Sequence, residues 1–147
     1  MKRFRFSLET LLSLRKERQQ ECEIALASAA GKLALIENRI EAARLAGERA
    51  FSEGGSSLYE LQARELLWMK SKNDRKSLEQ PRIEATVKVD SARKIYSLAH
   101  SERAALDKLR EKRMDQWKFS VKQEEIKRLD ETAKGAVARR RLTGGDE

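Results

Sequence analysis

The chain has 147 residues, of which 38% are charged and 39% are apolar, and 32 Lys and Arg against 24 Asp and Glu give it a net charge of +8. Seven glycines, one proline and 5% aromatic residues leave little material for a β-sheet and favour long helices or coiled coils. One cysteine and one histidine exclude a disulfide within the chain and any site built from several Cys or His ligands.

The first predicted helix covers about residues 8–52. From Leu8 onward, steps of four and three residues alternate without a break, and only Arg15 and Gln19 are charged or amide side chains. A repeat of 3.5 residues keeps one narrow stripe of a helix against a partner helix and is typical of a coiled coil. The predicted stripe comprises Leu8, Leu12, Arg15, Gln19, Cys22, Leu26, Ala29, Leu33, Ile36, Ile40, Ala43, Gly47 and Ala50.

Residues 53–57 predict a hinge. Gly54 and Gly55 are adjacent and supply the backbone freedom that commonly ends a helix. Ser57 lies three residues before Glu60, which is the spacing of a capping box at the start of the next helix.

A short helix is expected over about residues 58–78. Pro81 lacks an amide hydrogen and disfavours helical backbone at the residue before it, so a break is expected near residues 79–81. The short helix either folds back or continues into the next one. Because a straight second helix would leave residues beyond about 102 unpaired, we favour a fold-back or a staggered overlap.

The second long helix is expected over about residues 83–141, followed by a flexible tail at 142–147 that contains two glycines. Its apolar stripe is less regular than the first, because the spacing lengthens to four after Leu109. The predicted stripe comprises Ala92, Ile95, Ala99, Glu102, Leu106, Leu109, Arg113, Trp117, Val121, Ile126, Leu129, Ala133 and Ala136.

These elements predict an all-α fold, a long antiparallel two-helix coiled coil with a short helical segment near the hinge. Neither helix is stable alone in water on propensity, so the two stripes are expected to bury each other. The result is a single helical hairpin over residues 1–141. Both chain ends then lie at one pole, where residues 2–12 meet residues 126–141.

The sequence offers no constellation for catalysis or for a cofactor. The glycines form no phosphate-binding loop, so we expect no catalytic, metal or cofactor site and no small-molecule substrate. Cys22 is interpreted as a small apolar side chain in the stripe, and His100 as a lone surface histidine. No apolar run approaches the length that spans a bilayer, and we expect a protein of the reducing cytoplasm.

Positive charge gathers toward the second end of the chain, where residues 107–141 hold twelve Lys and Arg against seven Asp and Glu. One hypothesis is therefore a basic coiled coil that binds nucleic acid. Interspersed carboxylates and the lack of stacking aromatics near residues 139–141 argue against nucleic acid, and an acidic protein surface or an anionic membrane face suits this pole better.

Several large apolar side chains cluster near the hinge. They pack into a local mini-core against the hairpin, or they form an exposed patch for a protein partner. The sequence leaves these two interpretations equal. The residues concerned are Phe51, Tyr59, Trp68 and Met69.

The two ends of the chain carry the most specific patterns. Residues 2–15 (KRFRFSLETLLSLR) have the order aromatic-x-aromatic, x-Leu-x-x-Leu-Leu and then Arg. This order resembles the opening of the FliJ family of flagellar type III export proteins. The stretch 109–131, with Arg139 and Arg140 after it, is similar to that family's closing region. The injectisome stalk proteins are close relatives of this family and remain an alternative.

The resemblance implies a non-enzymatic stalk component. Family members are antiparallel coiled coils that insert their paired termini into the ring of the export ATPase. They also contact the membrane export-gate protein and escort export chaperones. The resemblance therefore implies a cytoplasmic protein that associates only peripherally with the inner face of the cell membrane.

Two sets of candidate contact residues follow from this resemblance. The set expected to bind the ATPase is Phe4, Phe6, Leu8, Leu11, Leu12, Arg15, Leu129, Arg139 and Arg140. The set expected to bind the export gate, assigned by its place near the opposite end, is Ile40, Leu45, Phe51, Tyr59 and Leu66.

Overall fold

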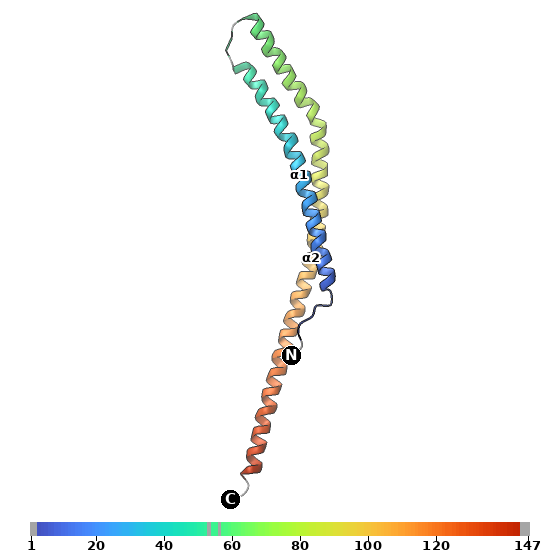
Figure 1. Cartoon of the computed structure of the whole chain (residues 1–147), viewed down its shortest axis with the longest axis vertical. Coiled ribbons are helices and arrows are strands. Elements are labelled where there is room, and N and C mark those ends of the chain that lie inside the picture. The colour runs from blue at the N-terminus through green and yellow to red at the C-terminus, as the bar shows by residue number, and fades with distance from the viewer. Residues whose placement is uncertain (1–2, 53, 56, 145–147) are drawn as a thin grey trace. The chain divides into compact units, whose positions relative to one another are not determined.

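The computed structural model describes residues 3–52, 54–55 and 57–144. Two helices account for nearly all of them: α1 spans Glu9–Ser52 and α2 spans Leu58–Thr143 (Figure 1). The described residues form no strand. The predicted all-α fold of two long helices that pack against each other is confirmed.

The chain divides into two compact units. One unit is Arg15–Ser101, and the other combines the described residues up to Leu14 with those from Glu102 onward. Both helices contribute to both units, because the division falls inside α1 and inside α2. The prediction of one hairpin over residues 1–141 stays a prediction.

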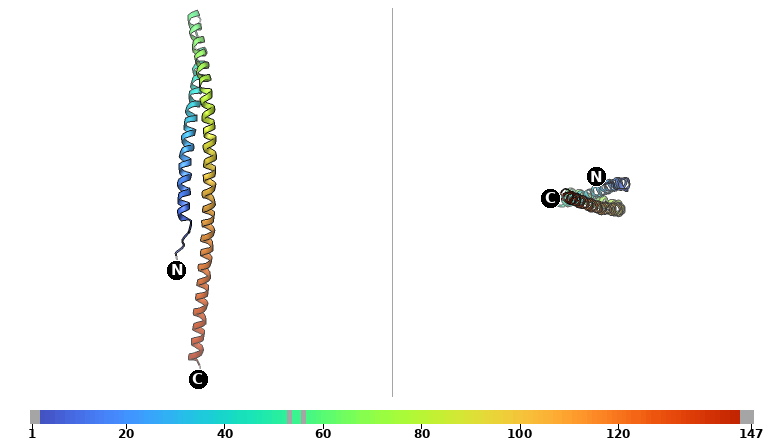
Figure 2. Two further views of the ribbon diagram at one scale, coloured as in Figure 1. Left: turned by 90° about the vertical axis from the view of Figure 1, so that its right-hand side faces the viewer. Right: turned by 90° about the horizontal axis from the view of Figure 1, so that it is seen from below.

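Within Arg15–Ser101, α1 and α2 run side by side in opposite directions (Figures 1 and 2). The Ser71 hydroxyl donates a hydrogen bond to the carbonyl oxygen of Ala43, and further along the pair Gln19 contacts Tyr96. Later residues of α1 thus pair with earlier residues of α2. This is the antiparallel arrangement that a hairpin requires.

The α1 stripe faces its partner as predicted. All thirteen predicted positions, from Leu8 to Ala50, are buried or half-buried, and the positions between them are almost all exposed. Leu12 is 1% exposed and is the most deeply buried large side chain of the described residues. The 3.5-residue repeat therefore identified the covered face of α1 correctly.

The covered face of α2 differs in part from the predicted stripe. Ala85, Val89 and Ala99 are buried, and Tyr96 is half-buried, whereas the predicted Ile95 is exposed. Four-three spacing from Ala85 passes through Val89, Ala92, Tyr96 and Ala99. The predicted order Ala92, Ile95, Ala99 also follows three-four spacing, but the covered face takes the more polar tyrosine one residue later.

The expected break near residues 79–81 is absent, and so is a separate helix over 58–78. α2 continues through Pro81 without interruption. A proline inside a helix removes one backbone hydrogen bond and costs about 3 kcal/mol. Leu78 is half-buried and Ala85 is buried, so packing on both sides of Pro81 holds the adjoining turns in helical register.

The hinge ends where α2 begins. The backbone amide of Glu60 donates to the Ser57 hydroxyl at 3.2 Å, so Ser57 caps α2 as its spacing predicted. Residues 53 and 56 of the predicted hinge lie outside the described residues. Of the predicted tail, Leu142 and Thr143 belong to α2, while residues 145–147 lie outside the described part.

Candidate protein-interaction surfaces

The segment before α1 lies along α2. The rings of Phe4 and Trp117 are 5.9 Å apart, and the Arg110 guanidinium donates to Glu9 Oε2 at 3.1 Å. Phe4 and Phe6 are half-buried, whereas the alternate residues are exposed. This alternation is typical of extended backbone laid against a surface.

The same segment forms an open groove of about 580 Å³ whose walls combine aromatic rings and guanidinium groups. Arg3, Arg5 and Arg113 line it beside Phe6 and Trp117. Arginine and aromatic side chains are both enriched where proteins bind one another. The chemistry of the groove therefore suits a contact with a protein surface that carries acidic side chains.

The structure brings Phe4 and Phe6 to residues 110–120 of α2 instead of to residues 126–141, so the predicted meeting of the two ends is wrong. Trp117 and Arg139 are 22 positions apart on one helix, which corresponds to about 33 Å. The physical reason is the unequal length of the helices, 44 residues in α1 and 86 in α2. Because α1 is the shorter helix, the antiparallel pair ends while α2 continues.

The last part of α2 is consequently open to solvent. Residues 122–144 are exposed apart from half-buried Gly135, and Figure 2 shows α2 continuing beyond the N-terminal segment. Of the predicted ATPase-binding residues, Leu129 is 67% exposed, and Arg139 and Arg140 are exposed. Residues 133–144 contain four Lys and Arg and no Asp or Glu.

The other predicted ATPase-binding residues lie near the start of α1. Leu12 is buried and Leu8 is half-buried, so both serve the packing of the helices. Leu11 is 37% exposed, and Arg15 is half-buried in the stripe. Only Leu11 of these four leaves much of its side chain accessible to a partner.

The apolar residues near the hinge form an exposed surface. The rings of Phe51 and Trp68 are 6.1 Å apart in an edge arrangement, and the Lys72 ammonium lies 5.2 Å from the centre of the Trp68 ring. Tyr59 is 81% exposed, and Leu66, seven positions later on the same helix face, is also exposed. No separate helix covers them, because α2 is continuous, so the exposed-patch interpretation is the one that fits.

The two remaining predicted gate-binding residues differ from each other. Leu45 is exposed, whereas Ile40 is half-buried in the α1 stripe. Ile40 therefore contributes mainly to helix pairing. Phe51, Tyr59 and Leu66 carry most of the accessible apolar surface of the predicted set.

A polar cluster that the sequence did not reveal crosses the helix pair at Gln19. Gln19 is buried, and its amide nitrogen lies 3.5 Å from the Tyr96 hydroxyl and 3.2 Å from His100 Nδ1. An amide nitrogen only donates, so His100 Nδ1 accepts this bond. His100 is exposed, as expected, but it stacks on Tyr96 with ring centres 6.1 Å apart. The sequence feature that could have indicated this cluster is a polar residue, Gln19, within the apolar stripe, with His100 on the opposite helix.

The described residues contain no group of three or more His, Cys, Asp or Glu side chains that could hold a metal ion. No described helix is long and apolar enough to cross a membrane. Cys22 is a buried free thiol within the stripe, in agreement with its interpretation as an apolar side chain. The accessible features of the described chain are thus the aromatic groove, the basic end of α2 and the patch near the hinge.

Comparison with known proteins identifies one family. A family model described as "Flagellar FliJ protein" matches residues 4–142. No curated protein and no solved structure gives a significant match to the chain.

Proposed function

The chain belongs to the FliJ family of flagellar proteins, and we propose that it is the non-enzymatic stalk of the flagellar export ATPase. The family match covers almost the whole chain and is the observation that carries this proposal. It also favours the flagellar over the injectisome apparatus, since the family is one of flagellar type III export components.

The accessible surfaces support a role in binding and positioning partners. In the proposal, the groove around Phe4 and Phe6 and the exposed end of α2, with Leu129, Arg139 and Arg140, contact the ATPase ring. Leu8, Leu12 and Arg15 hold the helices that present these surfaces. Leu11 adds a contact beside them.

The proposal is tested with the purified chain and the export ATPase of the same organism. We expect the chain alone to hydrolyse no ATP, and to raise both ATP hydrolysis and ring assembly when it is added to the ATPase. Phe4→Ala combined with Leu129→Asp should lower the stimulation, while Leu66→Asp, at the patch near the hinge, should leave it unchanged. Unchanged hydrolysis and unchanged ring assembly with the wild-type chain would contradict the proposal.

The patch near the hinge is proposed as the contact for the membrane export-gate protein. Phe51, Tyr59 and Leu66 supply the exposed apolar surface, with Leu45 beside them and Ile40 in the supporting stripe. Tyr59→Ala with Leu66→Ala should weaken capture of the cytoplasmic part of the gate protein without changing ATPase stimulation. Equal capture by wild type and variant would exclude this patch as the gate contact.

The proposal places the protein in the cytoplasm, peripherally at the inner face of the membrane and in contact with export chaperones. It needs no cofactor. The competing hypothesis of nucleic-acid binding predicts retention on DNA at low salt that falls steeply as salt rises. Lack of retention at low salt eliminates that hypothesis.

A further inference from the structure

The helix-pairing stripe of α2 ends near Val121. Trp117 and Val121 are half-buried, and Trp117 contacts the N-terminal segment. Continuing the same spacing leads to Glu124, Arg128 and Glu131, which are charged and exposed. This face of α2 therefore has no apolar stripe to offer beyond Val121.

A second stripe begins at Phe119, on another face of the same helix. Steps of three and four residues from Phe119 meet an apolar side chain at five of seven positions up to residue 140. Phe119 follows Trp117 by two residues, which turns it about 200° around the helix, away from the covered face. We name this the terminal seam; its apolar members are Phe119, Ile126, Leu129, Ala133 and Ala136.

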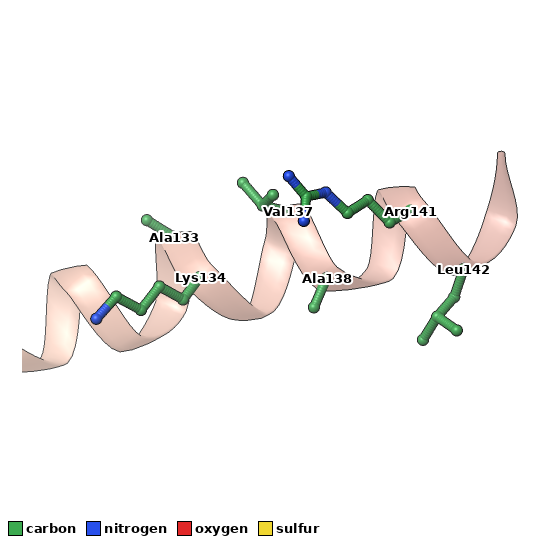
Figure 3. A pocket seen from close by; sticks show the side chains of 6 residues that line it. All are labelled: Ala133, Lys134, Val137, Ala138, Arg141 and Leu142. Carbon is green, nitrogen blue, oxygen red and sulfur yellow. The ribbon is translucent and has the colours of Figure 1, made fainter.

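The terminal seam is open along its whole length. Phe119 is 63% exposed, Ile126 is 58% exposed and Leu129 is exposed to a similar degree. Figure 3 shows that Ala133 and the neighbouring Val137 point to one side of α2, whereas Leu142 points to the opposite side. An unbroken 3.5-residue repeat exposed over six turns is the pattern that pairs with another helix.

The charges of the seam describe the helix that fits it. Its two polar positions are Lys122 and Arg140; Glu125 and Asp130 flank its first half, whereas residues 133–144, in its second half, carry only positive charges. A second copy of the chain is a poor occupant, because parallel pairing sets Lys122 against Lys122 and antiparallel pairing sets Arg140 close to Lys122. Carboxylates beside an apolar stripe complement these cations.

We infer that the terminal seam docks an amphipathic helix of a partner protein whose apolar stripe is flanked by Asp or Glu. The seam includes Leu129 and Arg140, so the inference deepens the proposed function and rests on it for the identity of the protein that supplies the helix. The chemistry of the docked helix follows from the seam alone.

The test uses the full chain and synthetic three-heptad peptides as probes. Two fluorescent peptides share one Leu and Ile stripe, and the flanking positions are Glu in the first and Lys in the second. Binding is followed by fluorescence anisotropy. We expect the Glu peptide to bind at least about tenfold more tightly than the Lys peptide at low salt, with the difference shrinking at about 0.5 M salt.

Variants locate the binding face. Ile126→Asp with Leu129→Asp changes two exposed residues of the seam and should weaken binding of the Glu peptide by at least about tenfold. Leu142→Asp is the matched control, since Leu142 is exposed, apolar and on the opposite side of the same helix. It should retain wild-type affinity, and circular dichroism should show equal helicity in all three chains.

Three outcomes would overturn the inference. These are equal binding of the two peptides, equal loss of binding in the seam variant and the Leu142→Asp control, and self-association of the wild-type chain that the seam variant abolishes. The last result would identify a second copy as the occupant. A wild-type chain that binds the Glu peptide but leaves the ATPase unstimulated would contradict the proposed function while supporting the inference.

Discussion

The covered stripe of α1 and the terminal seam of α2 have the same spacing and opposite environments. In α1 the thirteen predicted positions from Leu8 to Ala50 are buried or half-buried. In the terminal seam, Phe119, Ile126 and Leu129 are more than half exposed. Periodicity thus identifies a face that can pair with a helix, but it does not tell whether the same chain supplies that helix.

The difference arises from helix length and register. α1 is about half as long as α2, so one part of α2 has a partner within the chain and another part does not. The exposed stripe begins at Phe119 on another face of α2, just before the covered stripe ends at Val121 and close to the point where pairing with the N-terminal segment ends. A coiled-coil protein can therefore hold one helix permanently and keep a second face for a partner.

The largest expected effect is the difference in the free energy of unfolding between alanine variants of buried Leu12 and of exposed Leu129. Leu12→Ala removes a side chain that is almost fully buried and should lower the free energy of unfolding by about 2 to 4 kcal/mol. Leu129→Ala should change it by less than about 0.5 kcal/mol, because Leu129 is exposed. Urea unfolding followed by circular dichroism measures both. Equal losses would mean that the terminal seam is covered within the chain.

The two helical glycines of α1 sharpen the comparison. A Cβ at Gly47 would lie 2.6 Å from Ser71 Oγ and 3.0 Å from Ser71 Cβ, where the serine is held by its bond to Ala43. At Gly31 a Cβ would meet no atom within 4 Å.

Gly31→Ala should therefore raise stability by about 0.5 to 1 kcal/mol through helix propensity. Gly47→Ala should instead lower stability by about 1 kcal/mol, because crowding of α2 at Ser71 outweighs the gain in helix propensity. Thermal unfolding of the two variants distinguishes them. Similar stabilisation by both would show that the helices do not approach closely at Gly47.

A smaller effect is expected at the polar cluster. A double-mutant cycle of Gln19→Ala and His100→Ala should give a coupling energy of about 0.5 to 1.5 kcal/mol, because the two side chains share a hydrogen bond. Gln20 is the matched control, since it is exposed and next in sequence. Gln20→Ala and His100→Ala should be additive, and additivity in the Gln19 cycle would contradict the contact.

The smallest effect concerns an exposed ion pair on α1. The hydrogen bond from the Arg44 guanidinium lowers the pKa of the Glu41 carboxyl from its ordinary value of 4.5. The pair therefore contributes to stability above pH 4.5, and the contribution is lost as pH falls through the lowered pKa.

An NMR titration should place the Glu41 midpoint below 4.5, and Arg44→Gln should move it back toward that value. The effect on thermal stability should be slight, because both side chains are well exposed to water. If the Glu41 midpoint is the same with and without Arg44, the hydrogen bond from Arg44 does not lower the pKa of Glu41.

The sequence predicted α1 better than α2 for a physical reason. The stripe of α1 is made of aliphatic and small side chains in strict register, so spacing alone identified its covered face. In α2 the covered face includes Tyr96, whereas the prediction placed Ile95 between Ala92 and Ala99, a choice that three-four spacing also allows. Register, fixed by neighbours such as Val89 and Ala99, outweighs the polarity of one residue.

At Pro81 and at the chain ends, packing between the helices decided the structure, and local sequence preferences did not predict it. A proline favours a helix break locally, but packing at Leu78 and Ala85 keeps α2 continuous. Without that break, α2 extends past the N-terminal segment, and Phe4 meets Trp117 instead of residues 126–141. Phe4 therefore has a different neighbour from the one predicted, and ATPase binding by the candidate residues stays a prediction.

Cys22 gives the molecule a built-in reporter. It is the one cysteine of the sequence, and its thiol is buried between the helices. A water-soluble disulfide reagent can react only when α1 and α2 separate locally at that point. The rate at which the Cys22 thiol reacts in the native chain, divided by the rate in the denatured chain, thus measures how often the helix pair opens. The measurement can be made with and without a bound partner, and it needs no introduced label.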